Sequence, residues 1–180
     1  ALVWGSGFEQ MFKQLGVAEI LMCKGSVSPS VSDITDLTEG VKSKSVILIC
    51  NDPNVIQSAS QVSKMSRGRV HVLETITMPQ GISAMEGFDK GKTIKENLKS
   101  MERNKNLVRT GEVCFATKSG TSNGLDFSKG DSIALLEKRL TAVNESTGAV
   151  LLEFINEVLQ DTDDEHITIY WGDNVAAVDA

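Results

Sequence analysis

The sequence predicts an α/β fold, in which a parallel sheet with flanking helices is followed by a second, α+β subdomain with a β-meander. Continuous apolar runs such as 45–49 are typical of strands covered on both faces. These runs alternate with helix-periodic segments joined by short links, as in parallel α/β layers. After Arg109 short strands separated by turn signals take over. We therefore expect a parallel α/β subdomain over 1–91, a connecting amphipathic helix over 92–108, and an α+β subdomain over 109–180.

The first subdomain is expected to open with a helix. Ser6 and Glu9 have the spacing of a capping box, and Gly16 is a typical helix stop. Strands are expected at 18–22, 45–49 and 69–73, because each is short, apolar and bounded by polar turns.

Each of these strands is followed by a predicted helix. Ser30 and Asp33 form a second capping box, and Asn51 or Asp52 can cap a third helix that has Pro53 in its first turn. The apolar stripe expected to face the core on that third helix consists of Val55, Ile56, Ala59, Val62 and Met65. A polar turn at 75–81 leads into a short apolar helix.

In the second subdomain, strands are expected at 109–117, 132–136 and 139–143. Asn123-Gly124 and Lys129-Gly130-Asp131 mark turns between them, and Glu137-Lys138 separates the last two strands. A helix over 146–160 and a final strand over 166–171 complete the pattern. The chain does not begin with Met and ends in the start of another helix, so we expect it to be a piece of a longer polypeptide.

Composition and charge limit the function classes. Hydrophobic residues make up 41% of the 180 residues, which is the globular range, and the net charge of −6 argues against general nucleic-acid binding. No apolar run approaches the ~18 residues of a membrane span, and no signal peptide is recognisable. Three cysteines without metal spacing, Cys23, Cys50 and Cys114, are expected to be reduced thiols of a cytoplasmic protein.

Catalytic and metal-binding patterns are not visible in the sequence. His71 and His166 each lie within an expected strand, where a packing role is favoured over catalysis. The sequence has no zinc-type His or Cys spacing, no P-loop and no dinucleotide fingerprint. We therefore expect no catalytic residue, no metal and no cofactor within this chain.

Polar residues collect after each of the three predicted parallel strands. Because the carboxyl ends of parallel strands meet at one edge of a sheet, these loops are expected to form a single binding edge. The candidate binding residues are Ser26, Ser28, Ser30, Asn51, Asn54, Thr75, Thr77, Gln80 and Gly81. Hydroxyls and amides without a titratable base suit binding of a carboxylate, a phosphate or a peptide edge. The alternative is that they only cap helices and form turns.

The same strand ends carry a resemblance to a known family. The residues concerned are Pro29, Ser30, Asp33, Ile34, Asn51, Asn54 and the run 74–81, of which the last is the closest match; the segments 110–113, 129–131 and 167–173 also fit. At these positions the chain resembles the C-terminal region of the A component of bacterial fatty acid kinase, which is a dihydroxyacetone-kinase-like (DAK2-domain) protein. The likeness extends over essentially the whole chain.

This resemblance implies a DegV-like fold for the parallel subdomain and a role in docking. In the family, a separate domain binds ATP and magnesium, and the parent is expected to be a homodimer. The C-terminal region docks a DegV-type fatty-acid-binding protein through an acidic surface, and the bound fatty acid becomes an acyl-phosphate. Residues 161–180 contain six acids and no Lys or Arg, and the candidate docking residues are Asp161, Asp163, Asp164, Glu165 and Asp173.

The sequence therefore predicts a noncatalytic docking module of a fatty acid kinase subunit. The first rival function is a small-ligand domain that binds an acyl chain or an anion at the three-loop edge. The second rival, an autonomous kinase or phosphatase, lacks a visible base or metal set. No nucleic acid and no membrane span are expected.

Overall fold

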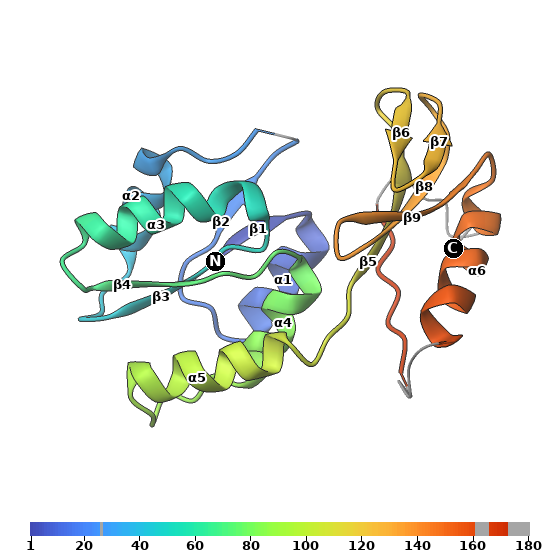
Figure 1. The fold of residues 1–180 in the computed structure, drawn as a ribbon. Helices are drawn as coiled ribbons and strands as arrows, with labels where there is room; N and C mark the ends of the chain where they lie inside the picture. Colours follow the sequence, from blue (N-terminus) through green and yellow to red (C-terminus); the bar gives the residue numbers. More distant parts are fainter. Residues whose placement is uncertain (26, 161–165, 173–180) are drawn as a thin grey trace. The chain divides into compact units, whose positions relative to one another are not determined.

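The computed structural model describes residues 1–25, 27–160 and 166–172, which form a mixed α/β protein with small sheets (Figure 1). The chain divides into two compact units, Ala1–Val108 and Arg109–Ala180. Helix α5, Ile94–Lys105, belongs to the first unit, where it packs on α4.

The first unit alternates strands and helices along the chain. Its elements are β1 Leu2–Trp4, α1 Ser6–Gln14, β2 Leu21–Cys23, α2 Val31–Gly40, β3 Val46–Ile49, the 3₁₀ turn Pro53–Val55, α3 Ile56–Met65, β4 Val70–Leu73, α4 Met78–Glu86 and α5. The expected strands and helices are all present. Strand β1 was not predicted, because three residues are too few to show a period.

The parallel strands form two separate pairs instead of the one continuous sheet that the sequence suggested. Strand β1 pairs with β2 from Leu2↔Leu21 to Trp4↔Cys23, and β3 pairs with β4 from Val46↔Val70 to Ile49↔Leu73, both in parallel. No ladder connects the two pairs among the described residues. Strand pairing depends on the spacing of the backbone between distant segments. Apolar runs predict where strands lie, but they do not predict which strands pair.

Helix starts follow local capping chemistry in most cases. Ser30 caps α2 with a full capping box, since its Oγ accepts from the Asp33 amide and its own amide donates to the Asp33 carboxylate. Asp52, and not Asn51, caps the turn that begins at Pro53. The predicted capping box at Ser6 is wrong: Gly5 is the N-cap, and no side chain bonds there.

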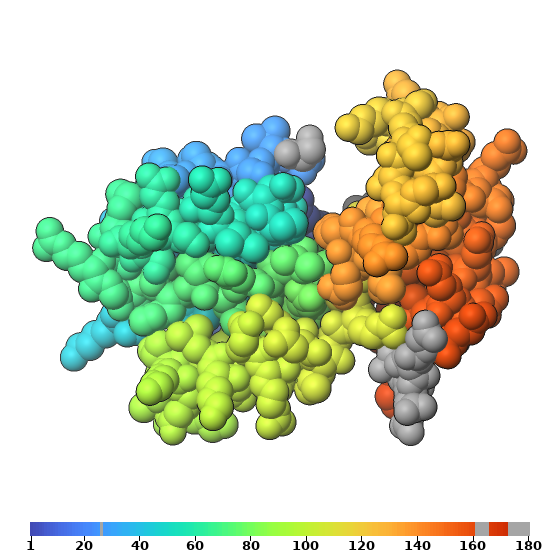
Figure 2. Space-filling model, in the orientation of Figure 1, coloured from blue at the N-terminus to red at the C-terminus, as the bar shows by residue number. Residues whose placement is uncertain are grey.

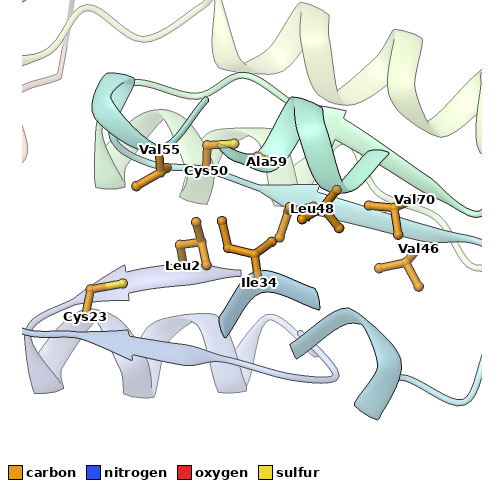
Figure 3. Close-up of a cluster of buried hydrophobic side chains, with 10 residues drawn as sticks. Leu2, Cys23, Ile34, Val46, Leu48, Cys50, Val55, Ala59 and Val70 are labelled. Atoms are coloured by element: carbon orange, nitrogen blue, oxygen red, sulfur yellow. The ribbon is translucent and has the colours of Figure 1, made fainter. Parts of the chain in front are cut away.

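Two buried clusters hold the first unit together. One contains Leu2 and Cys23 of the first strand pair, Leu48 and Val70 of the second, and Ile34 of α2 between them (Figure 3). The other lies on the opposite side of the strands and includes Val3, Phe12, Ile49, Leu73 and Met101. The prediction that Met65 faces the core is wrong, because its side chain at the end of α3 is 62% exposed.

A single arginine joins the end of α2 to the start of β4. The Arg69 guanidinium donates to the carbonyl oxygens of Thr38, Val41 and Ser43, at 3.0, 2.6 and 3.1 Å. A helix end leaves carbonyls without intrahelical partners, and a cation there is favoured by the helix dipole. Arg69 thereby fixes the α2–β3 connection.

The second unit is an antiparallel sheet covered by one helix. Its elements are β5 Gly111–Phe115, β6 Gly120–Ser122, β7 Leu125–Phe127, β8 Ser132–Leu136, β9 Arg139–Asn144 and α6 Thr147–Gln160. Strands β5, β8 and β9 form one sheet in that order, while β6 and β7 form a hairpin that projects from this unit (Figure 2). The expected turns occur at Asn123-Gly124 and Glu137-Lys138, all four with positive φ.

The predicted strand over 166–171 is absent. The described residues 166–172 have no regular secondary structure, and Ile167, Ile169 and Trp171 expose 52%, 51% and 64% of their surface. Alternating apolar residues have high strand propensity, but a strand also needs a partner with matching register. The core of this unit consists instead of Ala134, Ala142, Val150 and Phe154.

Candidate functional site at the carboxyl edge of the strands

The carboxyl edge of the first unit is organised around Asn51. This residue follows β3 with a φ of 61°, a left-handed conformation that asparagine tolerates better than most residues. Its amide N–H donates to Thr75 Oγ1 at 2.8 Å, and Thr75 Oγ1 donates in turn to Asn51 Oδ1 at 2.9 Å. Its side-chain Nδ2 donates to the Leu2 carbonyl at 2.9 Å. Asn51 therefore connects the start of β1 with the segments that follow β3 and β4.

Gly81 allows helix α4 to pack against this asparagine. A Cβ on Gly81 would lie 2.0 Å from Asn51 Oδ1 and 2.9 Å from Phe12 Cζ. No side chain fits in that space. Next to Gly81, Gln80 accepts a hydrogen bond from the Ile76 amide at 2.9 Å through Oε1, which shapes the turn before α4.

These four residues form a buried polar cluster. Asn51, which follows β3, meets Thr75 and Gly81 of the later segment 75–81, in which Gln80 is next to Gly81, and Asn51 and Thr75 are 4% and 0% exposed. Among the described residues, no buried side-chain N or O lacks a hydrogen-bond partner. The side-chain polar groups of Asn51 and Thr75 are thus engaged within the protein, where they set the geometry of the edge.

The other candidate residues lie apart from this cluster. Ser30 and Thr77 act as N-caps of α2 and α4, and Asn54 lies exposed in the 3₁₀ turn. Ser28 lines a surface depression of about 470 Å³ beside the end of β2, together with Asp33 and Lys24. Ser26 and the docking candidates Asp161, Asp163, Asp164, Glu165 and Asp173 lie outside the described residues.

The titratable groups near this edge are poorly suited to proton transfer. The hydroxyl and backbone amide of Ser30 hold the pKa of Asp33 below its usual value, so this carboxylate stays charged. Burial, with a smaller effect of Glu74, raises the pKa of the Cys50 thiol to about 12. All three cysteines are free thiols, and Cys23 and Cys50 are buried. Low basicity in Asp33 and a protonated Cys50 favour binding or structural roles.

Metal-type clusters and bilayer-length helices are absent from the described part of the chain. Residues 1–25, 27–160 and 166–172 contain no group of three or more His, Cys, Asp or Glu side chains arranged to hold a metal ion. Within the same ranges, no helix has the length and apolarity to cross a bilayer.

Sequence reasoning missed two features of the first unit. Asn97 lies within the predicted amphipathic helix, yet it is 2% exposed and bonds to Asp89 and Lys92. A cavity of about 410 Å³ extends along β3, where Ala1, Val41, Met85 and residues of α5 also line it. The burial of Asn97 could have been predicted, because it is a polar residue on the apolar face of 94–101. The cavity could not, because no local sequence pattern predicts it.

Comparison with known proteins places the chain in a family. The family model for the C-terminal region of proteins like the A component of fatty acid kinase matches residues 1–180. Protein YloV of Bacillus subtilis strain 168 is 27% identical over 176 residues, which cover 98% of this chain and 32% of that protein. Uncharacterized protein SAR1202 of Staphylococcus aureus strain MRSA252 is 28% identical over 168 residues, 93% of this chain and 30% of that protein.

The chain thus spans about a third of the length of these relatives. The family match covers both units, from the parallel strand pairs with the Asn51 cluster to the antiparallel sheet. The resemblance noted at the three strand ends is confirmed. This chain belongs to the FakA-like C-terminal family, the C-terminal regions of proteins like the A component of fatty acid kinase.

Proposed function

We propose that this chain is a noncatalytic module of a fatty acid kinase subunit that docks a DegV-type fatty-acid-binding protein. The kinase domain of the parent protein would then phosphorylate the bound fatty acid to acyl-phosphate, using ATP and magnesium. The family match over residues 1–180 carries this proposal. We further propose that the parent is a cytoplasmic homodimer.

The carboxyl edge supports docking over small-ligand chemistry. The side-chain polar atoms of Asn51 and Thr75 are already hydrogen-bonded to each other, to the Asn51 amide and to the Leu2 carbonyl, so few hydrogen-bonding groups remain for a ligand. A rigid edge of this kind is suited to holding loops in place for a protein partner. The alternative function is binding of an acyl chain or an anion at this edge. The side chain that supports it is the exposed Ser28, which lines the surface depression beside β2.

The acidic segment supplies the charge for docking. The segment that contains Asp161, Asp163, Asp164, Glu165 and Asp173 has no Lys or Arg, which suits a basic surface on the partner. Charged docking surfaces accelerate association and make it dependent on ionic strength. We therefore expect affinity for the fatty-acid-binding protein of the same organism to fall as salt is raised.

A charge-matched pair of variants tests this docking surface by calorimetry. Replacing the five acids of the segment by Asn or Gln is expected to weaken binding at least about tenfold and to flatten the salt dependence. The control replaces five exposed acids elsewhere, Asp36, Glu39, Glu86, Glu153 and Glu157, and makes the same change in net charge. Equal weakening by both variants, or by neither, would show that the segment is not the docking surface.

A further inference from the structure

Helix α6 of the second unit has an apolar face that its own sheet does not cover. Its inner side packs on the sheet through Val150 and Phe154, which are buried. A second row of apolar residues, Leu152, Ile155 and Leu159, has the spacing of three and four that brings side chains to one face of a helix. Leu152 and Leu159 are 65% and 40% exposed, so this outer row of α6 is largely open in the part of the chain that the structure describes.

The outer row is the pattern of a helix with two covered sides. A helix that is apolar on more than one side is typically buried on each of them. Single exposed leucines occur on every protein surface, whereas contiguous apolar patches mark interaction sites. The acids of α6 do not interrupt the row, because Glu153 and Glu157 lie at least about 100° around the helix axis from each of its members. We therefore expect another molecule to cover the outer row.

The segment that follows α6 adds further exposed apolar side chains to this unit. Ile167, Ile169 and Trp171 alternate along residues 166–172, and none of them has a backbone–backbone hydrogen bond to another described residue. Within the described ranges, the longer first unit exposes four large hydrophobic side chains and the second unit exposes seven, which are Phe115, Leu152, Leu159, Ile167, Ile169, Tyr170 and Trp171. Exposed apolar surface is thus concentrated in the second unit, and most of it belongs to α6 and the segment after it.

The charged residues that alternate with these apolar residues in the sequence are acids. Asp161 comes two residues after Leu159, and Asp173 comes two residues after Trp171. No Lys or Arg follows Arg139 in this sequence, so the stretch that contains α6 and residues 166–172 has a negative net charge. The exposed apolar residues are therefore accompanied by negative charge along the chain.

Three kinds of molecule can cover a surface of this composition, and its charge favours one of them. A second copy of the chain would bring the same acids together, because a two-fold contact pairs each surface patch with itself. A bilayer surface with anionic lipids attracts polybasic segments and repels acids. A protein with basic residues around an apolar patch is attracted by the acids and buries the apolar side chains at the same time.

We propose that the outer row of α6 and the exposed residues Ile167, Ile169 and Trp171 form the apolar contact centre of the docking surface. The partner is a protein with an apolar patch bordered by Lys and Arg. Interfaces commonly have such an apolar centre within a polar rim, and tryptophan is frequent among the residues that contribute most to binding. This inference rests on the proposed docking function and adds the side chains that hold the partner once charge has attracted it.

A pair of substitutions that leaves the net charge unchanged tests the outer row by calorimetry. Leu152→Gln with Leu159→Gln is made in a longer protein that contains this chain and has the length of its relatives. Binding of the DegV-type protein of the same organism should weaken at least about tenfold, as for other substitutions at the centre of an interface.

The matched control makes the same change on the first unit. Met65→Gln with Leu107→Gln removes apolar side chains that are 62% and 69% exposed, and it should leave the affinity unchanged. Equal effects of the two pairs would overturn the proposal. Thermal denaturation without the partner identifies a folding defect, and Trp171→Gln, outside every helix and strand, repeats the test if α6 is destabilised.

Binding rates distinguish the apolar centre from the acids. Apolar contacts act mainly on the dissociation rate, whereas charges at the rim act on the association rate and its salt dependence. Leu152→Gln with Leu159→Gln should therefore accelerate dissociation at least about tenfold and leave the salt dependence of association unchanged. A changed salt dependence without faster dissociation would show that α6 is not the contact centre. Absence of binding by the unsubstituted protein would refute the docking function itself, and this inference with it.

Side-chain footprinting distinguishes the partner from other polypeptide as the covering molecule. Hydroxyl-radical labelling with mass spectrometry is made on the longer protein, alone and with the DegV-type protein. Leu152, Leu159 and Trp171 should be labelled in the protein alone and protected by the partner, while the exposed Met65 is labelled in both. Protection without the partner would show that the longer protein itself covers the row, or a second copy where protection grows with protein concentration, and the proposal would be wrong.

Discussion

At the scale of single residues, the Asn51 cluster shows how one side chain can join the segments after β3 and β4 to the start of β1. Asn51 uses its backbone amide, its Oδ1 and its Nδ2 in three separate hydrogen bonds to Thr75 and Leu2. Such a fully satisfied buried network specifies one arrangement, because any displacement leaves polar groups without partners. The cluster therefore explains why the loops meet, whatever they bind.

The contact between Gly81 and Asn51 gives the first prediction at this scale. Gly81→Ala places a methyl group 2.0 Å from Asn51 Oδ1, so either α4 or the asparagine must shift. We expect a loss of about 1–3 kcal/mol in the free energy of unfolding, as for other overpacked sites.

Urea denaturation measures this loss, and Gly7→Ala is the control. Gly7 lies in α1, and a Cβ there meets no atom within 4 Å, so this substitution should be neutral or slightly stabilising. Similar free energies for Gly81→Ala and wild type would mean that the close contact is relieved at no cost.

At the scale of elements, the capping box of α2 links stability to pH. Ser30 donates two hydrogen bonds to the Asp33 carboxylate, from its amide at 2.8 Å and its hydroxyl at 2.7 Å, and these lower the Asp33 pKa. A carboxylate whose pKa is depressed by folding stabilises the native state above its unfolded pKa. That contribution is lost as pH falls through the folded pKa.

Ser30→Ala should therefore lower the Tm at neutral pH and have a smaller effect in acid, because the carboxylate that accepts the two bonds from Ser30 is lost as the pH falls through the folded pKa of Asp33. Thermal denaturation of the variant and wild type between about pH 7 and pH 2.5 measures this difference. Thr93→Ala provides a replicate at α5, where Thr93 bonds to Glu96 in the same way and lowers its pKa. A Tm difference that stays constant over this range would contradict the assignment.

At the scale of the whole molecule, the two units have separate hydrophobic cores. A destabilising substitution in one core can therefore be tested for its effect on hydrogen exchange in both units. Gly111 lies in β5 with Phe154 of α6 directly over it, and a Cβ would fall 2.1 Å from Phe154 Cζ. We expect Gly111→Ala to reduce hydrogen-exchange protection by about 1–3 kcal/mol at Ala142 and Val150, which share that core.

Leu48 and Leu73, in the two cores of the first unit, serve as internal controls in the same experiment. Their amides report the opening of a different core, so their protection should remain within experimental error. An equal loss at all four positions would show that the chain opens as one cooperative unit.

The sequence by itself determined the local elements of this protein. Apolar runs gave the strands at β2, β3 and β4, polar residues and glycines gave the helix ends, and residue pairs gave the turns at Asn123-Gly124 and Glu137-Lys138. Ser30 and Asp33 also revealed the cap of α2. These features depend on residues within a few positions of one another, so a linear pattern contains them.

Only the tertiary structure decided which strands pair and where space remains between them. The split between β1 and β3, the close approach of Gly81 to Asn51 and the cavity along β3 all depend on distances between segments far apart in the chain. The apolar residues of 167–171 show that a strand-like sequence pattern alone does not produce a strand. They have the composition of a strand, but pairing requires a partner edge in register, and that is a property of the folded chain.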